Sequence, residues 1–238
     1  MQEKNTTRRP NHFHGEYKNP NLPYESGVKS LINISELLKY GLILFIPLAA
    51  FEATLTAFPL VNAAGYSSFL ADITANNRDV LNALIASSLV YRLVYLFCIV
   101  MTSWFLFRAT RNLNTVAPDQ LGTSPHFAWL WFFIPFANFY KPYQTVSDID
   151  RVTKTTIGVG KTSNSIIMTW WVIFIASVFI GATDIRLPFA NWYKLGLALD
   201  VISGVLAIAA AILFIRVTHE IAKNQQHLGQ AGVAHVFD

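Results

Sequence analysis

The chain alternates between long apolar stretches and shorter polar segments. Four apolar stretches approach or exceed the length needed to cross a membrane, at residues 37–61, 80–107, 165–185 and 195–215. A helix rises about 1.5 Å per residue, so crossing a hydrocarbon core of about 30 Å takes about 20 residues. The pattern predicts an all-α integral membrane protein with four transmembrane helices. The segment at 62–79, between the first two stretches, is more polar and is predicted to be a loop.

A fifth apolar run, from Phe127 to Tyr140, is too short to cross a membrane and contains Pro135. A proline inside a helix removes a hydrogen bond and clashes with the preceding turn, so we expect a break near Ile134. The run either lies along the cytoplasmic interface as a bent element or enters the membrane and returns as a re-entrant segment. We favour the interface, because a re-entrant backbone needs cover for its polar groups. Amphipathic rings also collect at membrane interfaces, and this run holds Trp129, Trp131 and Tyr140.

Residues 142–154 are predicted to form a short amphipathic helix on the cytoplasmic side, with Pro142 in its first turn. Apolar side chains recur every three residues, at Tyr143, Val146, Ile149 and Val152. Charged side chains are expected on the opposite face, at Asp148, Asp150, Arg151 and Lys154. This pattern is typical of a helix that lies on a membrane surface or on a helix bundle.

The composition supports a membrane protein. Hydrophobic residues make up 53% of the 238 residues and charged residues only 13%, whereas soluble domains carry about 25% charged residues. The single cysteine, Cys98, lies in an apolar stretch, which excludes an intramolecular disulfide and a cysteine-cluster metal site.

The basic residues predict the orientation in the membrane, because short cytoplasmic loops carry an excess of Lys and Arg. Fourteen of the eighteen lie in the amino tail through Lys39, the central region 108–164 and the carboxyl tail. The pattern therefore predicts that both termini and the central region are cytoplasmic. The expected organisation is a partly disordered tail at 1–36, a four-helix membrane domain at 37–222 and a cytoplasmic tail at 223–238.

Three charged residues lie inside the apolar stretches: Glu52, Arg92 and Asp200. Counted from the cytoplasmic ends of their helices, all three lie at similar depth, so they can form an intramembrane cluster. A charge at mid-membrane is costly unless it is paired, which makes these residues candidates for binding. The cluster would be either a structural ion pair that fixes helix register or a site for a substrate, ion or proton. Snorkelling to the outer interface is the remaining alternative.

The segments Arg108-Ala-Thr-Arg111-Asn112-Leu113, Ser124-Pro125 and WFFIPFANFYKPYQ at 131–144 resemble the signature of a bacterial membrane family known as domain of unknown function 4328. The resemblance covers about residues 38–222. It implies four membrane helices and a bacterial plasma (inner) membrane, and it supplies no activity. The family-like motif comprises Arg108, Arg111, Asn112, Pro125, Trp131, Pro135, Asn138, Lys141, Pro142 and Gln144.

The sequence favours a non-catalytic module that binds a protein or lipid partner at the cytoplasmic membrane face. One alternative is a small oligomeric transporter or channel that uses Glu52, Arg92 and Asp200. Another is a membrane enzyme that acts on a lipid or quinone. The sequence identifies no catalytic, cofactor-binding or metal-binding residues, and we expect no cofactor. The lipid bilayer is the expected partner and nucleic acid is not, while a homo-oligomer or a membrane protein partner stays open.

Overall fold

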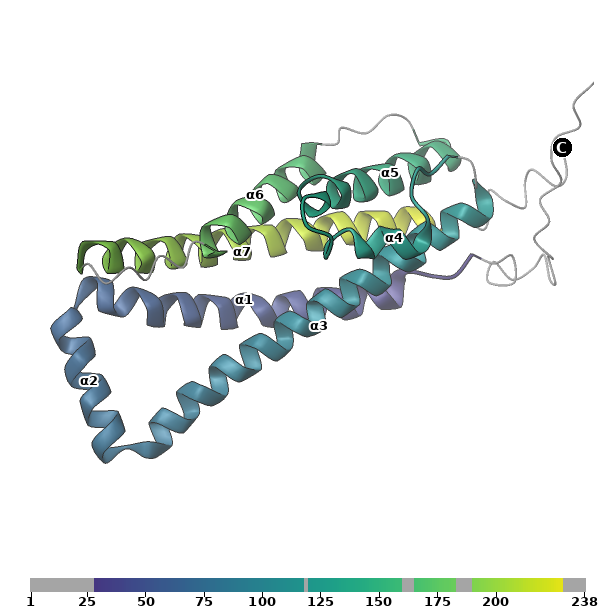
Figure 1. Ribbon diagram of the computed structural model, residues 1–238. Coiled ribbons are helices and arrows are strands. Elements are labelled where there is room, and N and C mark those ends of the chain that lie inside the picture. The colour runs from purple at the N-terminus through teal and green to yellow at the C-terminus, as the bar shows by residue number, and fades with distance from the viewer. Residues whose placement is uncertain (1–27, 118–119, 160–164, 183–189, 229–238) are drawn as a thin grey trace, which may run out of the picture.

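The computed structural model describes residues 28–117, 120–159, 165–182 and 190–228 (Figure 1). Four helices are long and apolar enough to cross a membrane: α1 (Ile32–Val61), α3 (Arg78–Val116), α6 (Ser165–Ala182) and α7 (Ala190–Gln225). The predicted all-α membrane fold with four spanning helices is therefore confirmed. Both α3 and α7 continue well beyond the predicted spans. Most of the two predicted tails, including residues 1–27 and 229–238, lies outside the described residues.

The spanning helices run in alternating directions. Near the start of α1, Glu36 lies 3.8 Å from His219, which is near the end of α7. Antiparallel packing of α6 on α7 is shown by Ser203, whose hydroxyl donates to the Ser177 carbonyl (2.9 Å), and by Trp170, which stacks on Phe214. The beginnings of α1 and α6 and the ends of α3 and α7 therefore lie at one end of the bundle (Figure 1).

The helices α1 and α3 are in close contact over only part of their length. A Cβ atom added at Gly41 would lie 2.8 Å from the ring of Phe97, so glycine lets the two backbones approach there. Farther along, Tyr91 stacks on Phe45 with ring centroids 5.6 Å apart. Farther still, the Ser88 hydroxyl of α3 reaches the Glu52 carboxylate of α1 (2.8 Å). Beyond this bond α3 diverges from α1, and α2 (Ala63–Asn76) connects their separated ends (Figure 1).

The prediction of a polar loop at 62–79 is wrong, because most of this segment forms α2. The side chain of Asn62 caps the helix by accepting a hydrogen bond from the Gly65 backbone N–H (2.8 Å). The ring of Phe58, at the end of α1, packs edge-on against Tyr66. Ile73 is the buried residue of α2. The cap and a few apolar contacts, which include Phe58 on Phe69, thus hold a helix whose remaining side chains are largely exposed.

The central region contains α4 (Pro125–Leu130), a single 3-10 turn η1 (Ala137–Phe139) and α5 (Lys141–Thr156). The expected break is confirmed, since no helix continues through Ile134 and Pro135. Pro142 lies in the first turn of α5, also as predicted. The apolar face of α5 enters the core, where three side chains are at most 1% exposed: Val146, Ile149 and Val152. We call this end of the bundle the α5 end and the opposite one the α2 end.

Candidate functional site

The segment between α4 and α5, residues 131–140, forms what we call the aromatic turn. It is attached to α6 by its rings and by its backbone. The Trp171 indole N–H donates to the Phe139 carbonyl (3.1 Å), and Phe132 meets the Trp171 ring edge-on. The ring of Phe139 stacks on Phe179 with centroids 5.0 Å apart. The aromatic turn therefore has a fixed position beside α6 (Figure 1).

At the tip of the aromatic turn the backbone is strained. Phe136 has φ +64° and ψ −42°, and the Ala137 N–H donates to the Pro135 carbonyl (2.8 Å). This is a γ-turn of the rare form, and a non-glycine residue held there costs on the order of 1–3 kcal/mol. The Phe136 side chain is 84% exposed. The chain thus uses a strained turn to present a large apolar ring outside the bundle.

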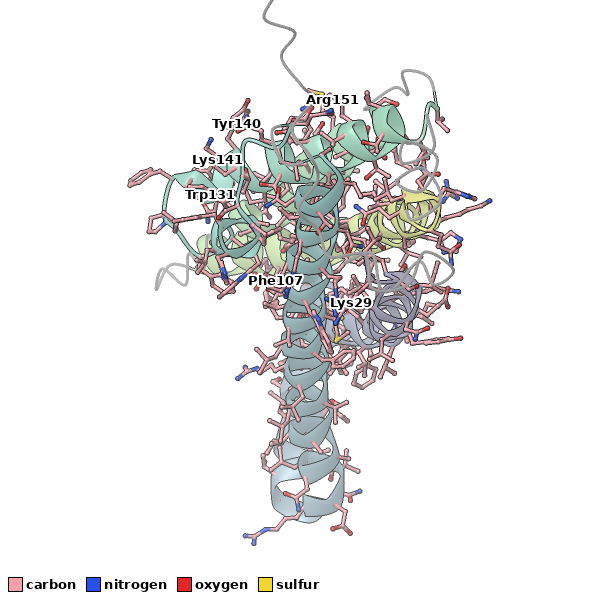
Figure 2. The ribbon with its side chains drawn as sticks, turned by 90° about the vertical axis from the view of Figure 1, so that its right-hand side faces the viewer. Lys29, Phe107, Trp131, Tyr140, Lys141 and Arg151 are labelled. Atoms are coloured by element: carbon pink, nitrogen blue, oxygen red, sulfur yellow. The ribbon has the colours of Figure 1, made fainter. Side chains whose placement is uncertain are left out.

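A cation lies at the base of the aromatic turn. The Lys141 ammonium is 5.6 Å from the centre of the Trp131 ring and donates to the Gln144 side-chain carbonyl (3.1 Å). A cation over an aromatic face contributes about 0.5–1 kcal/mol at an exposed site. Lys141 forms no ion pair with a described residue. Figure 2 shows Trp131, Tyr140 and Lys141 on the same side of the molecule.

Asn112 of the family-like motif organises a buried polar network. Its side-chain oxygen accepts from the Lys29 N–H (2.9 Å), and its amide donates to the Lys29 carbonyl (2.8 Å) and to Gln225 (3.0 Å). The Gln225 amide donates in turn to the Thr153 hydroxyl (3.2 Å) and the Ala109 carbonyl (3.3 Å). The network joins the segment before α1 to α3, α5 and α7. Its position is buried, with Asn112 only 1% exposed, so its role is to hold the α5 end together.

A second polar cluster corrects the predicted charged face of α5. Asp150 and Lys154 are buried, and the Lys154 ammonium contacts both Asp150 (2.8 Å) and Glu220 of α7 (2.7 Å). The helix packs against α7 as well as α3, so its charged side is covered by protein. Asp148 and Arg151 pair with each other at the surface (3.0 Å), where the prediction had placed them.

Burial raises the pKa of Asp150 above its ordinary value, since the loss of hydration outweighs the hydrogen bond and charge of Lys154. Burial acts in the opposite direction on Lys154, but its bonds to two carboxylates outweigh that effect and raise the Lys154 pKa. Lys154 is therefore positively charged throughout the physiological pH range. The sequence offered one signal for this cluster, the four-residue spacing of Asp150 and Lys154. It gave none for Glu220, which lies beyond the predicted fourth span.

Basic side chains outnumber acidic ones at the α5 end. The described acidic residues there are Glu36, Asp148, Asp150 and Glu220. The described basic residues there are Lys29, Lys39, Arg108, Arg111, Lys141, Arg151, Lys154, Arg216 and Lys223. All four acidic residues form ion pairs: Glu36 with Lys39, Asp148 with Arg151, and both Asp150 and Glu220 with Lys154. Within the described residues, the other basic side chains have no ion-pair partner. The α5 end therefore presents an excess of positive charge that the fold itself does not neutralise.

In the described part of the chain, Glu52 of the predicted intramembrane cluster is bonded to a serine of α3 and not to Arg92. The Ser88 hydroxyl of α3 donates to the Glu52 carboxylate of α1 (2.8 Å). Arg92 is exposed one turn farther along α3 and, in the described part of the chain, forms no ion pair with Glu52 or Asp200. Asp200 is half-buried on α7. A functional role for the three residues stays a prediction. Elsewhere in the described ranges, no three His, Cys, Asp or Glu side chains meet as a metal site would require.

A family model described as "Domain of unknown function (DUF4328)" matches residues 67–223. The chain belongs to this family. The resemblance drawn from the sequence is confirmed, although the match begins in α2 rather than near residue 38 and so leaves α1 ahead of it. Comparison with curated proteins and with solved structures gave no match. DUF4328 is defined without an activity, so the function has to be argued from the α5 end.

Proposed function

We propose that this DUF4328 protein is a non-catalytic membrane module that binds anionic phospholipid at the cytoplasmic face of a bacterial plasma membrane. The observation that carries the proposal is the aromatic turn with Lys141 at its base. Exposed rings and an ammonium without a carboxylate partner occur there side by side. The basic excess of the α5 end supports its placement on the cytoplasmic side, with both chain termini there.

The aromatic turn suits the boundary between acyl chains and headgroups. Its exposed rings include Phe133, Phe136 and Tyr140, at 57%, 84% and 58% exposure. In this arrangement the phenylalanine rings enter the acyl region, while the Tyr140 hydroxyl and the Lys141 ammonium stay among the headgroups. The anionic lipid of the cytoplasmic leaflet attracts each nearby cation by about 1 kcal/mol. Support for an interfacial rather than a re-entrant position comes from Lys141, whose charge is best solvated at headgroup level.

Nanodiscs with and without phosphatidylglycerol test the proposal, with phosphatidylcholine as the neutral background. We expect the full chain to unfold at a higher temperature with the anionic lipid, because binding to the folded state stabilises it. Lys141→Gln should reduce this increase more than Lys223→Gln, which removes an exposed charge of α7 outside the aromatic turn. Equal unfolding temperatures in the two lipids would overturn the proposal.

The orientation has its own test. Cysteines introduced at Ser67 of α2 and at Gly158 after α5 should differ in intact cells, with an impermeant reagent labelling only position 67. The native Cys98 is buried and provides little background. Labelling at position 158 from outside would reverse the orientation and remove the cytoplasmic lipid-binding proposal with it.

Transport is the second candidate, supported by the hydrogen bond between Glu52 and Ser88, which places a carboxylate between two apolar helices. Intramembrane ionisable residues mark ion and substrate pathways in many transporters. Four spans are few for a transporter, so this function would need an oligomer. Solute flux into proteoliposomes that disappears in Arg92→Ala would favour transport, while flux that never exceeds that of empty vesicles would exclude it for the solutes tested.

A further inference from the structure

One flank of α3 carries an aromatic ring and two arginines one turn apart, at Trp104, Arg108 and Arg111. Residues spaced by four and three lie on the same helix face. Trp104 is 51% exposed, Arg108 is half-buried and Arg111 is exposed. No charged residue lies between Arg92 and Arg108 along α3. The two arginines therefore stand where the apolar part of the helix ends, with the tryptophan one turn deeper.

The described part of the chain does not neutralise the guanidinium groups of Arg108 and Arg111. Among the described residues, neither forms an ion pair, and the buried Nε of Arg108 has no hydrogen-bond partner. An arginine cannot lose its proton at ordinary pH. Like charges one turn apart on a helix also repel each other. Two repelling cations without a carboxylate partner among the described residues are an arrangement that an added anion would stabilise.

We propose that Arg108 and Arg111 bind the phosphate group of an anionic phospholipid. The guanidinium is planar and presents its N–H groups as a fork that matches phosphate oxygens, so two of them one turn apart can share one phosphate. The inference rests on the proposed lipid binding and names a position for it. It also gives a role to the two arginines of the family-like motif, which the aromatic turn leaves unexplained.

The neighbouring side chains favour a lipid over free phosphate. The exposed Trp104 ring lies one turn deeper on the same flank, and Val100, which is 54% exposed, lies one turn deeper again. An exposed apolar strip that leads to a pair of cations fits a molecule with an acyl chain attached to its phosphate. A free phosphate would contact the arginines and leave the strip without an occupant.

The test measures phosphatidylglycerol binding to the full chain by native mass spectrometry. We expect Arg108→Gln with Arg111→Gln to weaken binding by about tenfold or more, since two charge-assisted contacts are lost. The double exchange to lysine should give an intermediate loss, because it keeps the charges and removes the forks. Arg216→Gln is the matched control: Arg216 is also exposed, unpaired among the described residues and at the α5 end, but belongs to α7.

Parental affinity in the folded double glutamine variant would overturn the site. If that variant does not fold, parental affinity in the double lysine variant would do the same. An equal loss in Arg216→Gln would show diffuse attraction to the whole end and would also overturn it. After any of these three outcomes the proposed function still stands as long as the parent prefers phosphatidylglycerol to phosphatidylcholine. Without that preference the proposed function itself fails. If inorganic phosphate stabilises the folded chain in detergent as much as phosphatidylglycerol does, the ligand of the two arginines is free phosphate and not a lipid.

Discussion

The two ends of the bundle are built in different ways. At the α5 end, buried hydrogen bonds and ion pairs connect elements that are far apart in the sequence, as in the bond between Asn112 and Gln225. At the α2 end, the side-chain bonds of α2 are local, such as the one from Ser67 to the Ala64 carbonyl. Only Ile73 of α2 is buried. A rigid α5 end can hold exposed rings and unpaired cations at defined positions, whereas the α2 end has little to fix a site in place.

The largest expected effect concerns the buried cluster of α5. Lys154→Met should lower the free energy of unfolding by about 3–5 kcal/mol, because it leaves the buried Asp150 carboxylate without its cation. Arg151→Met, in the same helix, should cost less than about 1 kcal/mol, since its side chain is 55% exposed and its pair with Asp148 is solvated. Denaturant titration in detergent measures both. Equal losses would mean that α5 is not held by its buried charges.

The next effect concerns the network at Asn112. Asn112→Leu should cost roughly 2–4 kcal/mol, since Lys29 and Gln225 lose their partner inside the protein. Hydrogen exchange should then become faster at residues 28–31, which directly precede α1. Asn114→Leu is the control, because Asn114 is half-buried on the same helix and makes no hydrogen bond with the described side chains. Unchanged exchange at 28–31 in the Asn112 variant would show that the network does not hold this segment.

The third effect concerns Ser88, which lies on α3 toward the α2 end. Its hydroxyl donates a hydrogen bond to Glu52 of α1. Ser88→Ala should cost about 1 kcal/mol, which is typical of one hydrogen bond. Ser87→Ala is the neighbouring control, since the Ser87 hydroxyl bonds the Leu84 carbonyl of its own helix and no other described residue. A loss of about 3 kcal/mol or more for Ser88→Ala would mean that the intramembrane carboxylate is as important to the fold as the cluster at Lys154.

Simple features of the sequence predict the four spanning helices, the break at Pro135 and the apolar face of α5. These features depend on properties that are local in the chain: run length, the missing N–H of proline, and side-chain spacing. The sequence does not predict the α2 helix because the segment is only mildly apolar, and an asparagine cap with a few apolar contacts stabilises it. Its signal was the alanine-rich start after Asn62.

The polar clusters were out of reach for a different reason. A charged face looks the same in the sequence whether water or another helix covers it, and α7 covers the one that contains Asp150 and Lys154. The partners Glu220 and Gln225 lie beyond the fourth apolar stretch, where hydropathy gives no information on packing. Asn112 belongs to the family-like motif, but its bonds to Lys29 depend on long-range contacts that no spacing rule encodes.

The smallest expected effect is a dependence of stability on pH. Its sign shows whether the salt bridge to Lys154 or the burial of Asp150 dominates the pKa of Asp150. A carboxylate stabilised by a salt bridge has a lowered pKa in the fold, so its contribution is lost as the pH falls. Burial instead raises the pKa of Asp150. Its contribution is therefore full below its unfolded pKa and declines as the pH rises through the folded one. Lys154, with a raised pKa, stays charged throughout this range and adds no slope.

We therefore expect the stability of the parent relative to Asp150→Asn to increase when the pH is lowered from 7 to about 4.5. Denaturant titration of both proteins at each pH gives this difference directly, and other carboxylates cancel between them. A decrease would show that the attraction of Lys154 exceeds the desolvation of Asp150. The buried cluster would then be a source of stability in its own right. An increase in relative stability at the lower pH would mean that the buried cluster serves to fix how α5 docks on α7. The proposed lipid-binding end requires such a fixed position.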